Sequence, residues 1–176
     1  IVMHMQNPHI PAMHFNTRYI CTTQNWFGGG MDVTPSIKDD NEKNKFHQTL
    51  KKMCTRHNKE YYKKYKKWCD EYFYLPHRNE ARGIGGIFFD YKKDNFEKDF
   101  KFIRDVGVTF QMIFNNIIEK KIKKKWTLKD KEMQYIKRGR YAEFNLLYDR
   151  GTKFGLQTGG NVEGILMSLP PIAKWK

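Results

Sequence analysis

The residues best suited to binding or catalysis lie along a predicted strand, residues 14–21. Their side chains alternate, so that His14, Asn16 and Arg18 share one face of the strand and mainly aromatic side chains share the other. An imidazole exchanges a proton near neutral pH, and a guanidinium together with an amide can hold an anion. This face therefore predicts a site that binds an anion and moves a proton.

Further arginines in predicted strands and loops extend this chemistry. They are Arg18, Arg78, Arg82, Arg138, Arg140 and Arg150. The planar guanidinium group binds a carboxylate through two parallel hydrogen bonds, so the set favours a polycarboxylate ligand. Asp32 and Asp149 lie near glycines at the ends of strand-like segments, where a side chain can reach a ligand. The alternative, that these arginines and aspartates pair with one another, stays equally open on composition alone.

Several other kinds of site have no support in the sequence. No Cys-x-x-Cys or His-Glu-x-x-His motif is present for zinc, and the three cysteines are irregularly spaced. The glycines at 28–30 lack the Lys-Ser/Thr that completes a phosphate-binding loop, and no Gly-x-Ser-x-Gly motif marks a serine hydrolase. The residues alone thus name no reaction.

The net charge of the 176 residues is +14, from 33 Lys and Arg against 19 Asp and Glu. Such an excess first suggests a nucleic-acid-binding protein. Most of it is lysine, 25 residues against 8 arginines, in runs at 63–67 and 120–125 that have helical character. Lysine runs on helices are usually solvated faces, so nucleic-acid binding is only an alternative hypothesis. The sequence contains no run of 18 uncharged apolar residues and therefore predicts no membrane-spanning helix.

The segments that must position these residues show either the apolar spacing of a helix or the two-residue alternation of a strand. Glycines and aromatic residues at 26–35 indicate a bulge or a close approach to a ligand. Helical spacing predicts helices over residues 39–59, 61–73 and 95–121, and from Thr127, a capping residue, to about Gly139. Strands are predicted over residues 14–21, 84–90, 141–150 and 163–169. This order predicts an α+β fold, an antiparallel sheet with helices packed on it, in a single domain.

Six long motifs closely resemble the oxygen-dependent coproporphyrinogen III oxidases of haem biosynthesis. They occur in the family's order and span almost the whole chain: residues 7–18, 26–35, 66–73, 77–90, 138–156 and 165–171. The resemblance implies a large antiparallel sheet with helices on both faces, and a homodimer. It also implies oxidative decarboxylation of two propionates of coproporphyrinogen III to vinyl groups, which gives protoporphyrinogen IX. Dioxygen is the oxidant, no organic cofactor is required, and a divalent metal has been disputed.

The resemblance also implies roles for individual residues. His14 matches the proposed proton donor, and Asp32 matches a carboxylate thought to bind the pyrrole N–H groups. Asp149 and Arg150 match a pair placed at the substrate. The substrate-binding positions are Asn16, Thr17 and Arg18 in one motif and Gly159, Gly160 and Asn161 in another. The proposed metal ligands are His4, His14, His47 and His77.

Some features depart from the family pattern. Many members have Arg where Asn161 stands, which removes one expected anion contact. The family domain extends beyond both ends of residues 1–176, so we expect a partial catalytic domain without its N- and C-terminal parts. A catalytically inactive porphyrinogen-binding member is therefore an alternative. The family occurs in the cytosol, the mitochondrial intermembrane space and plastids, and of these we expect the cytosol.

Overall fold

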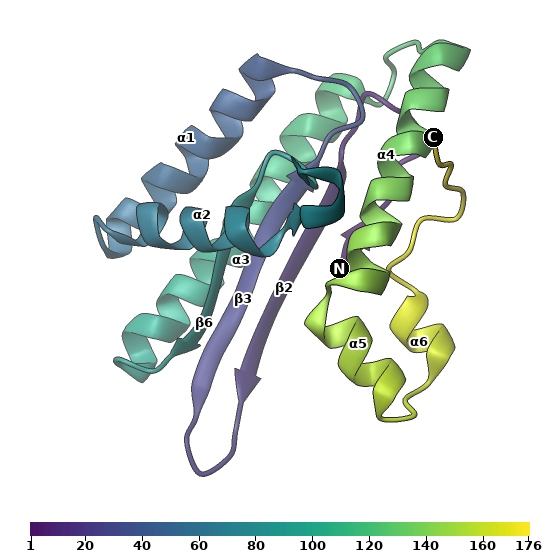
Figure 1. The fold of residues 1–176 in the computed structure, drawn as a ribbon. Helices are drawn as coiled ribbons and strands as arrows, with labels where there is room; N and C mark the ends of the chain where they lie inside the picture. The colour runs from purple at the N-terminus through teal and green to yellow at the C-terminus, as the bar shows by residue number, and fades with distance from the viewer.

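The computed structural model describes residues 1–176, and Figure 1 shows the arrangement of its helices and strands. The strands are β1 (Val2–Met3), β2 (Ala12–Ile20), β3 (Trp26–Thr34), β4 (Tyr74–Leu75), β5 (Glu80–Ala81) and β6 (Gly86–Lys92). The helices are α1 (Asp40–His57), α2 (Tyr61–Tyr72), α3 (Phe96–Lys121), α4 (Leu128–Leu147), α5 (Arg150–Gln157) and α6 (Val162–Leu166), with a 3₁₀ turn at Pro76–Arg78. No helix combines the length and the apolar character that crossing a bilayer requires.

Four strands form an antiparallel sheet in the order β1-β2-β3-β6, and β4 pairs with β5 in a separate two-stranded sheet. The β2–β3 register sets His14 opposite Asp32. Because side chains opposite each other in an antiparallel pair lie on the same face, this register alone brings an imidazole and a carboxylate together.

The two faces of the sheet differ in chemistry. One face carries Met13, Met31 and Phe89 into the main core, which also takes in apolar residues of α1 and α3. Phe15 of β2 stacks on Phe110 of α3, with the ring centroids 4.8 Å apart. In Figure 1, α3 runs behind the sheet, whereas α4, α5 and α6 stand beside β2. The opposite face carries the polar residues of β2 and a small apolar cluster of Cys69, Phe73, Leu75 and Phe144. The α+β fold with helices on both faces is therefore confirmed.

Three predicted helices begin close to the expected residues because capping side chains define their starts. Asp39, Asn95 and Thr127 each accept a hydrogen bond from a backbone N–H of the first turn, at the starts of α1, α3 and α4. Thr127 and Asp130 form a reciprocal capping box.

Two predicted strands are wrong. Residues 141–150 belong to the end of α4 and the start of α5, and residues 163–169 include α6. The alternation at 141–150 also fits a helix, because Tyr141, Phe144 and Asn145 are buried on one side of α4 at helical spacing. Gly139 does not end α4. A Cβ atom there would lie 2.3 Å from the carbonyl oxygen of Lys174, so glycine permits the C-terminal segment to approach the helix. The sheet consequently has four strands and is smaller than expected.

Candidate active site

A cavity of about 430 Å³ opens on the polar face of the sheet. Its walls come from β2, β6, the end of α2, α4 and the start of α5. The lining residues are Val2, His14, Asn16, Arg18, Tyr72, Phe73, Arg82, Phe88, Asp90, Tyr141, Asn145, Asp149, Arg150, Gly151, Thr152 and Ser168. We call this space the site cavity.

At the floor of the site cavity, His14 contacts a buried ion pair. Its Nδ1 lies 2.8 Å from Oδ1 of Asp32, and Nη2 of Arg82 lies 2.5 Å from Oδ2 of the same carboxylate. The side chains of Asp32 and Arg82 are 3% and 2% exposed, so both charges are removed from water. Burial alone raises the pKa of the Asp32 carboxyl, but the charge of Arg82 and the hydrogen bond from His14 outweigh it and hold that pKa below its ordinary value. The pair is therefore ionised.

The geometry determines which nitrogen of His14 faces the site cavity. A carboxylate only accepts hydrogen bonds, so Nδ1 of His14 must donate to Asp32. The other nitrogen, Nε2, lies 3.3 Å from the side-chain nitrogen of Asn16. In the neutral ring Nε2 is an acceptor and takes up a proton, and in the charged ring it donates one. The arrangement can move a proton at one defined atom.

Arg18 is held along the same face of β2. Its guanidinium lies 2.7 Å from Oδ2 of Asp90 and donates to the side-chain oxygen of Asn16 at 3.1 Å. Trp26 donates to the other oxygen of Asp90 at 3.2 Å. A Cβ atom on Gly28 would lie 2.5 Å from Asp90 and 2.7 Å from Arg18, so this glycine makes room for the ion pair.

Asp149 and Arg150 form the opposite wall, at the start of α5. The Asp149 carboxylate accepts a hydrogen bond from the Tyr72 hydroxyl at 3.0 Å and caps the helix by accepting from the Thr152 backbone N–H at 2.7 Å. The guanidinium carbon of Arg150 lies 5.6 Å from the centroid of the Tyr72 ring. Arg150 is exposed and has no carboxylate partner.

The other candidate arginines bind groups within the chain, and two of them form ion pairs. Arg78 and Arg140 bind Glu143, and Arg140 also binds Glu80. Arg138 donates to the backbone oxygen of Met5. Among the arginines that line the site cavity, Arg18 and Arg82 are neutralised and only Arg150 is free to receive an anionic ligand.

Of the ten residues predicted for catalysis or substrate binding, the structure brings six together and leaves four apart. His14, Asn16, Arg18, Asp149 and Arg150 line the site cavity, and Asp32 lies directly beneath it. Thr17 is exposed and points to the opposite face of β2. Gly159, Gly160 and Asn161 lie between α5 and α6 outside the cavity lining, and Asn161 caps α6 through a hydrogen bond from Gly164 N at 3.2 Å. Substrate contacts from these four positions stay predictions.

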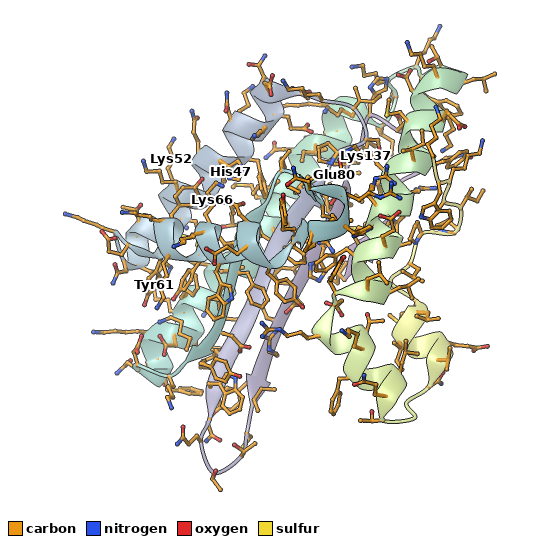
Figure 2. The ribbon with its side chains drawn as sticks, in the orientation of Figure 1. His47, Lys52, Tyr61, Lys66, Glu80 and Lys137 are labelled. Carbon is orange, nitrogen blue, oxygen red and sulfur yellow. The ribbon has the colours of Figure 1, made fainter.

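The four histidines proposed as metal ligands do not form a shared site. Each ring has separate partners: Ser168 O for His4, Asp32 for His14, Ile84 O and Tyr62 for His47, and Tyr148 and Glu143 for His77. Figure 2 shows His47 on the side of the molecule where Lys52 and Lys66 project. No group of three or more His, Cys, Asp or Glu residues is placed to hold a metal ion. These residues therefore do not fit a common metal.

Sequence reasoning missed several residues of the site cavity. Tyr72 belongs to an aromatic stripe of α2 that reads as core, and Asp90 is the last residue of the predicted apolar strand 84–90, which lies inside β6 in the structure. Asn145 and Tyr141 lie in a segment predicted as a strand, and Ser168 has no recognisable partner in the sequence. Arg82, by contrast, was named from the sequence as one of the arginines outside the lysine runs, although its pairing with Asp32 was not predicted.

Comparison with known proteins agrees with the resemblance. A family model described as coproporphyrinogen III oxidase matches residues 1–176. The chain belongs to this family. It is 58% identical to the oxygen-dependent coproporphyrinogen-III oxidase of Rickettsia bellii (strain OSU 85-389) and 57% identical to that of Rickettsia akari (strain Hartford). Each alignment covers 99% of this chain but 63% of the relative, so the chain spans less than two thirds of the length of these family members.

Proposed function

We propose that the natural protein carrying this chain is an oxygen-dependent coproporphyrinogen III oxidase. The reaction is the oxidative decarboxylation of two propionates to vinyl groups, which gives protoporphyrinogen IX. Membership of the family and relatives that carry this name support the proposal. The observation that carries it is a cavity lined both by an arginine without a carboxylate partner, Arg150, and by a histidine held by a buried carboxylate.

The chemistry balances with dioxygen as the oxidant. Each propionate loses carbon dioxide, two electrons and one proton from the carbon next to the ring, and a vinyl group remains. Each dioxygen molecule takes these two electrons, the proton released by the substrate and a second proton from water, and leaves as hydrogen peroxide. We propose that no organic cofactor takes part, as the family resemblance implies.

The residues of the site cavity have separate parts in this proposal. Arg150 binds a propionate, because a free guanidinium matches a carboxylate in shape and charge. His14 exchanges a proton at Nε2, the nitrogen that Asp32 leaves facing the cavity. Asp32 acts through His14 and Arg82, because both of its oxygens have partners and its side chain is 3% exposed. This differs from the direct contact with pyrrole N–H groups that the resemblance implies.

The test is aerobic incubation of the natural protein with coproporphyrinogen III, followed by oxidation and fluorescence detection of protoporphyrin. In air we expect protoporphyrinogen IX, together with equal amounts of hydrogen peroxide and carbon dioxide. Under nitrogen we expect none of the three. Binding without product at any pH between about 6 and 8 would indicate the inactive family member instead. Salt-sensitive binding of DNA or RNA without porphyrin binding would favour the nucleic-acid alternative.

We further propose a cytosolic homodimer. The family resemblance supports the dimer, and so do the exposed apolar side chains of α5 and α6, where Phe154 is 69% and Val162 is 54% exposed. The bacterial relatives support the cytosol. Light scattering after size-exclusion chromatography measures the mass, and a monomer at micromolar concentration would contradict the dimer.

A further inference from the structure

Both oxygens of the Asp149 carboxylate take part in local structure. Oδ1 accepts a hydrogen bond from the Tyr72 hydroxyl, and Oδ2 accepts one from the Thr152 backbone N–H. The backbone of Asp149 is extended, at φ −66° and ψ 120°, as is usual for a residue that caps a helix. Each oxygen therefore already accepts a hydrogen bond at the start of α5.

Tyr72 joins this cap to the floor of the site cavity. Its hydroxyl oxygen also accepts a hydrogen bond from the Arg150 backbone N–H at 3.3 Å, so one hydroxyl contacts two consecutive residues. Its ring stacks on Phe88 of β6 with centroids 4.8 Å apart and an interplanar angle of 6°. Burial raises the pKa of Tyr72 to about 12, so the hydroxyl keeps its proton and donates it to Asp149.

Arg150 depends on these contacts for its position. It is the first residue of α5, its guanidinium lies over the Tyr72 ring, and no acidic side chain holds it. An exposed arginine without partners samples many rotamers, and binding an anion then requires that freedom to be lost. The Tyr72 hydroxyl holds the backbone of residue 150, and the Tyr72 ring gives the Arg150 side chain a surface to lie on. Both contacts reduce the conformational entropy that Arg150 loses when it binds an anion.

We propose that Tyr72 and Asp149 are positioning residues, which hold the start of α5 so that Arg150 presents its guanidinium to a ligand carboxylate. This rests on the proposed function for the identity of the carboxylate. It assigns Asp149 no proton transfer, although the family resemblance places that residue at the substrate.

Substitution of Asp149 separates the two roles. Asparagine caps helices about as well as aspartate, and its amide group can donate to the Tyr72 oxygen while its carbonyl oxygen accepts from Thr152. It cannot exchange a proton as a carboxylate does. Alanine removes both hydrogen bonds. Asp149→Asn thus preserves positioning and abolishes acid–base chemistry, and Asp149→Ala abolishes both.

The experiment measures equilibrium binding of coproporphyrin III, a stable porphyrin with four propionates, to the natural protein by fluorescence titration, and KM and kcat with coproporphyrinogen III. For Tyr72→Phe and Asp149→Ala we expect about tenfold weaker binding, equal to about 1.4 kcal/mol, and a matching rise in KM. For both variants, kcat should stay within about threefold of the wild type. Asp149→Asn should bind coproporphyrin III about tenfold more tightly than Asp149→Ala and lower KM to match, because it keeps both hydrogen bonds of the cap. The control is Tyr74→Phe, an exposed tyrosine whose hydroxyl bonds Asn79 away from the site cavity.

A double-mutant cycle tests whether Tyr72 acts through Arg150. In an Arg150→Ala background, Tyr72→Phe should weaken binding by less than about twofold, because the group that it positions is gone. Circular dichroism checks that each variant is folded.

Three results would overturn the inference. The first is a loss of kcat of about 100-fold or more in Asp149→Asn with binding intact, which would assign the carboxylate to proton transfer. The second is additive effects of Tyr72→Phe and Arg150→Ala. The third is a wild type that does not bind coproporphyrin III. If the wild type binds this porphyrin but forms no product, the proposed oxidase fails, while the cycle still decides the positioning roles.

Discussion

Replacing Arg82 by methionine is the most informative perturbation of the buried ion pair beneath His14. Methionine keeps an apolar side chain of similar length, so contacts with the rings of Phe73, Tyr141 and Phe144 are largely retained. The positive charge is lost, and the Asp32 carboxylate keeps only His14 as a side-chain partner.

The expected magnitude follows from burial. With side-chain exposures of 2% and 3%, Arg82 and Asp32 form a pair shielded from water on both sides. Breaking such a pair by removing one partner destabilises a protein by about 3–5 kcal/mol, because the remaining charge stays buried without compensation. Arg56→Leu is the matched control, since Arg56 pairs with Asp105 at 3.4 Å and its side chain is 63% exposed. Exposed pairs of this kind contribute about 0–1 kcal/mol.

The pH dependence gives a second signature. In the wild type the folded pKa of Asp32 lies below its ordinary value of 3.8, so the ionised pair contributes stability above that value and loses it as the pH falls. Without Arg82, burial dominates and raises the folded pKa, so the variant is penalised most at neutral pH and less when Asp32 can be protonated. The free-energy gap between wild type and variant should therefore narrow on acidification.

Urea unfolding followed by circular dichroism at pH values of about 7, 5.5 and 4 measures this gap. The double variant Arg82→Met with Asp32→Asn should recover part of the lost stability, because it removes the unpaired charge as well. A gap below about 1 kcal/mol at neutral pH, or one that is the same at every pH, would refute the assignment of Asp32 and Arg82 as an ionised buried pair.

Three further predictions concern activity and local stability. Asp32→Asn should lower kcat by about 100-fold, because His14 loses the carboxylate that orients it, and kcat is measured where circular dichroism shows the variant to be folded, since Arg82 also loses its buried partner; turnover within about threefold of the wild type would remove Asp32 from the mechanism. Gly28→Ala should displace the Arg18–Asp90 pair and weaken coproporphyrin III binding by about tenfold; unchanged binding would show that this pair does not shape the site cavity. Hydrogen bonding from Arg78 lowers the pKa of Glu143 from 4.5 to about 2, so melting temperatures should fall between these pH values in the wild type and less in Glu143→Gln; parallel profiles would contradict this.

Much of the secondary structure could be predicted because its causes are local. The alternation of residues 14–21 placed His14, Asn16 and Arg18 on one face, and β2 forms there. Side chains at Asp39, Asn95 and Thr127 cap the helices that follow them. Such signals act over a few residues and need no information from the rest of the chain.

The errors arose where a short pattern fits two structures. At residues 141–150 the alternation of polar and apolar side chains suits a strand, but Tyr141, Phe144 and Asn145 also suit a helix, and packing against Phe73 and Arg82 decides for the helix. The aromatic stripe of α2 reads as core, and burial of Tyr65 and Cys69 agrees. Tyr72, in the same stripe, lies instead at the edge of the site cavity.

By itself, the sequence determined the family, the order of most elements and the face of β2 that carries the chemistry. Only the tertiary structure decided which charges neutralise one another. Asp32 and Arg82 are 50 residues apart, and Tyr72 and Asp149 are 77 residues apart. These contacts depend on strand register and helix packing, which no local pattern encodes. The three-dimensional arrangement thereby leaves Arg150 as the arginine of the site cavity that is free to bind an anion, a distinction that the amino-acid composition could not make.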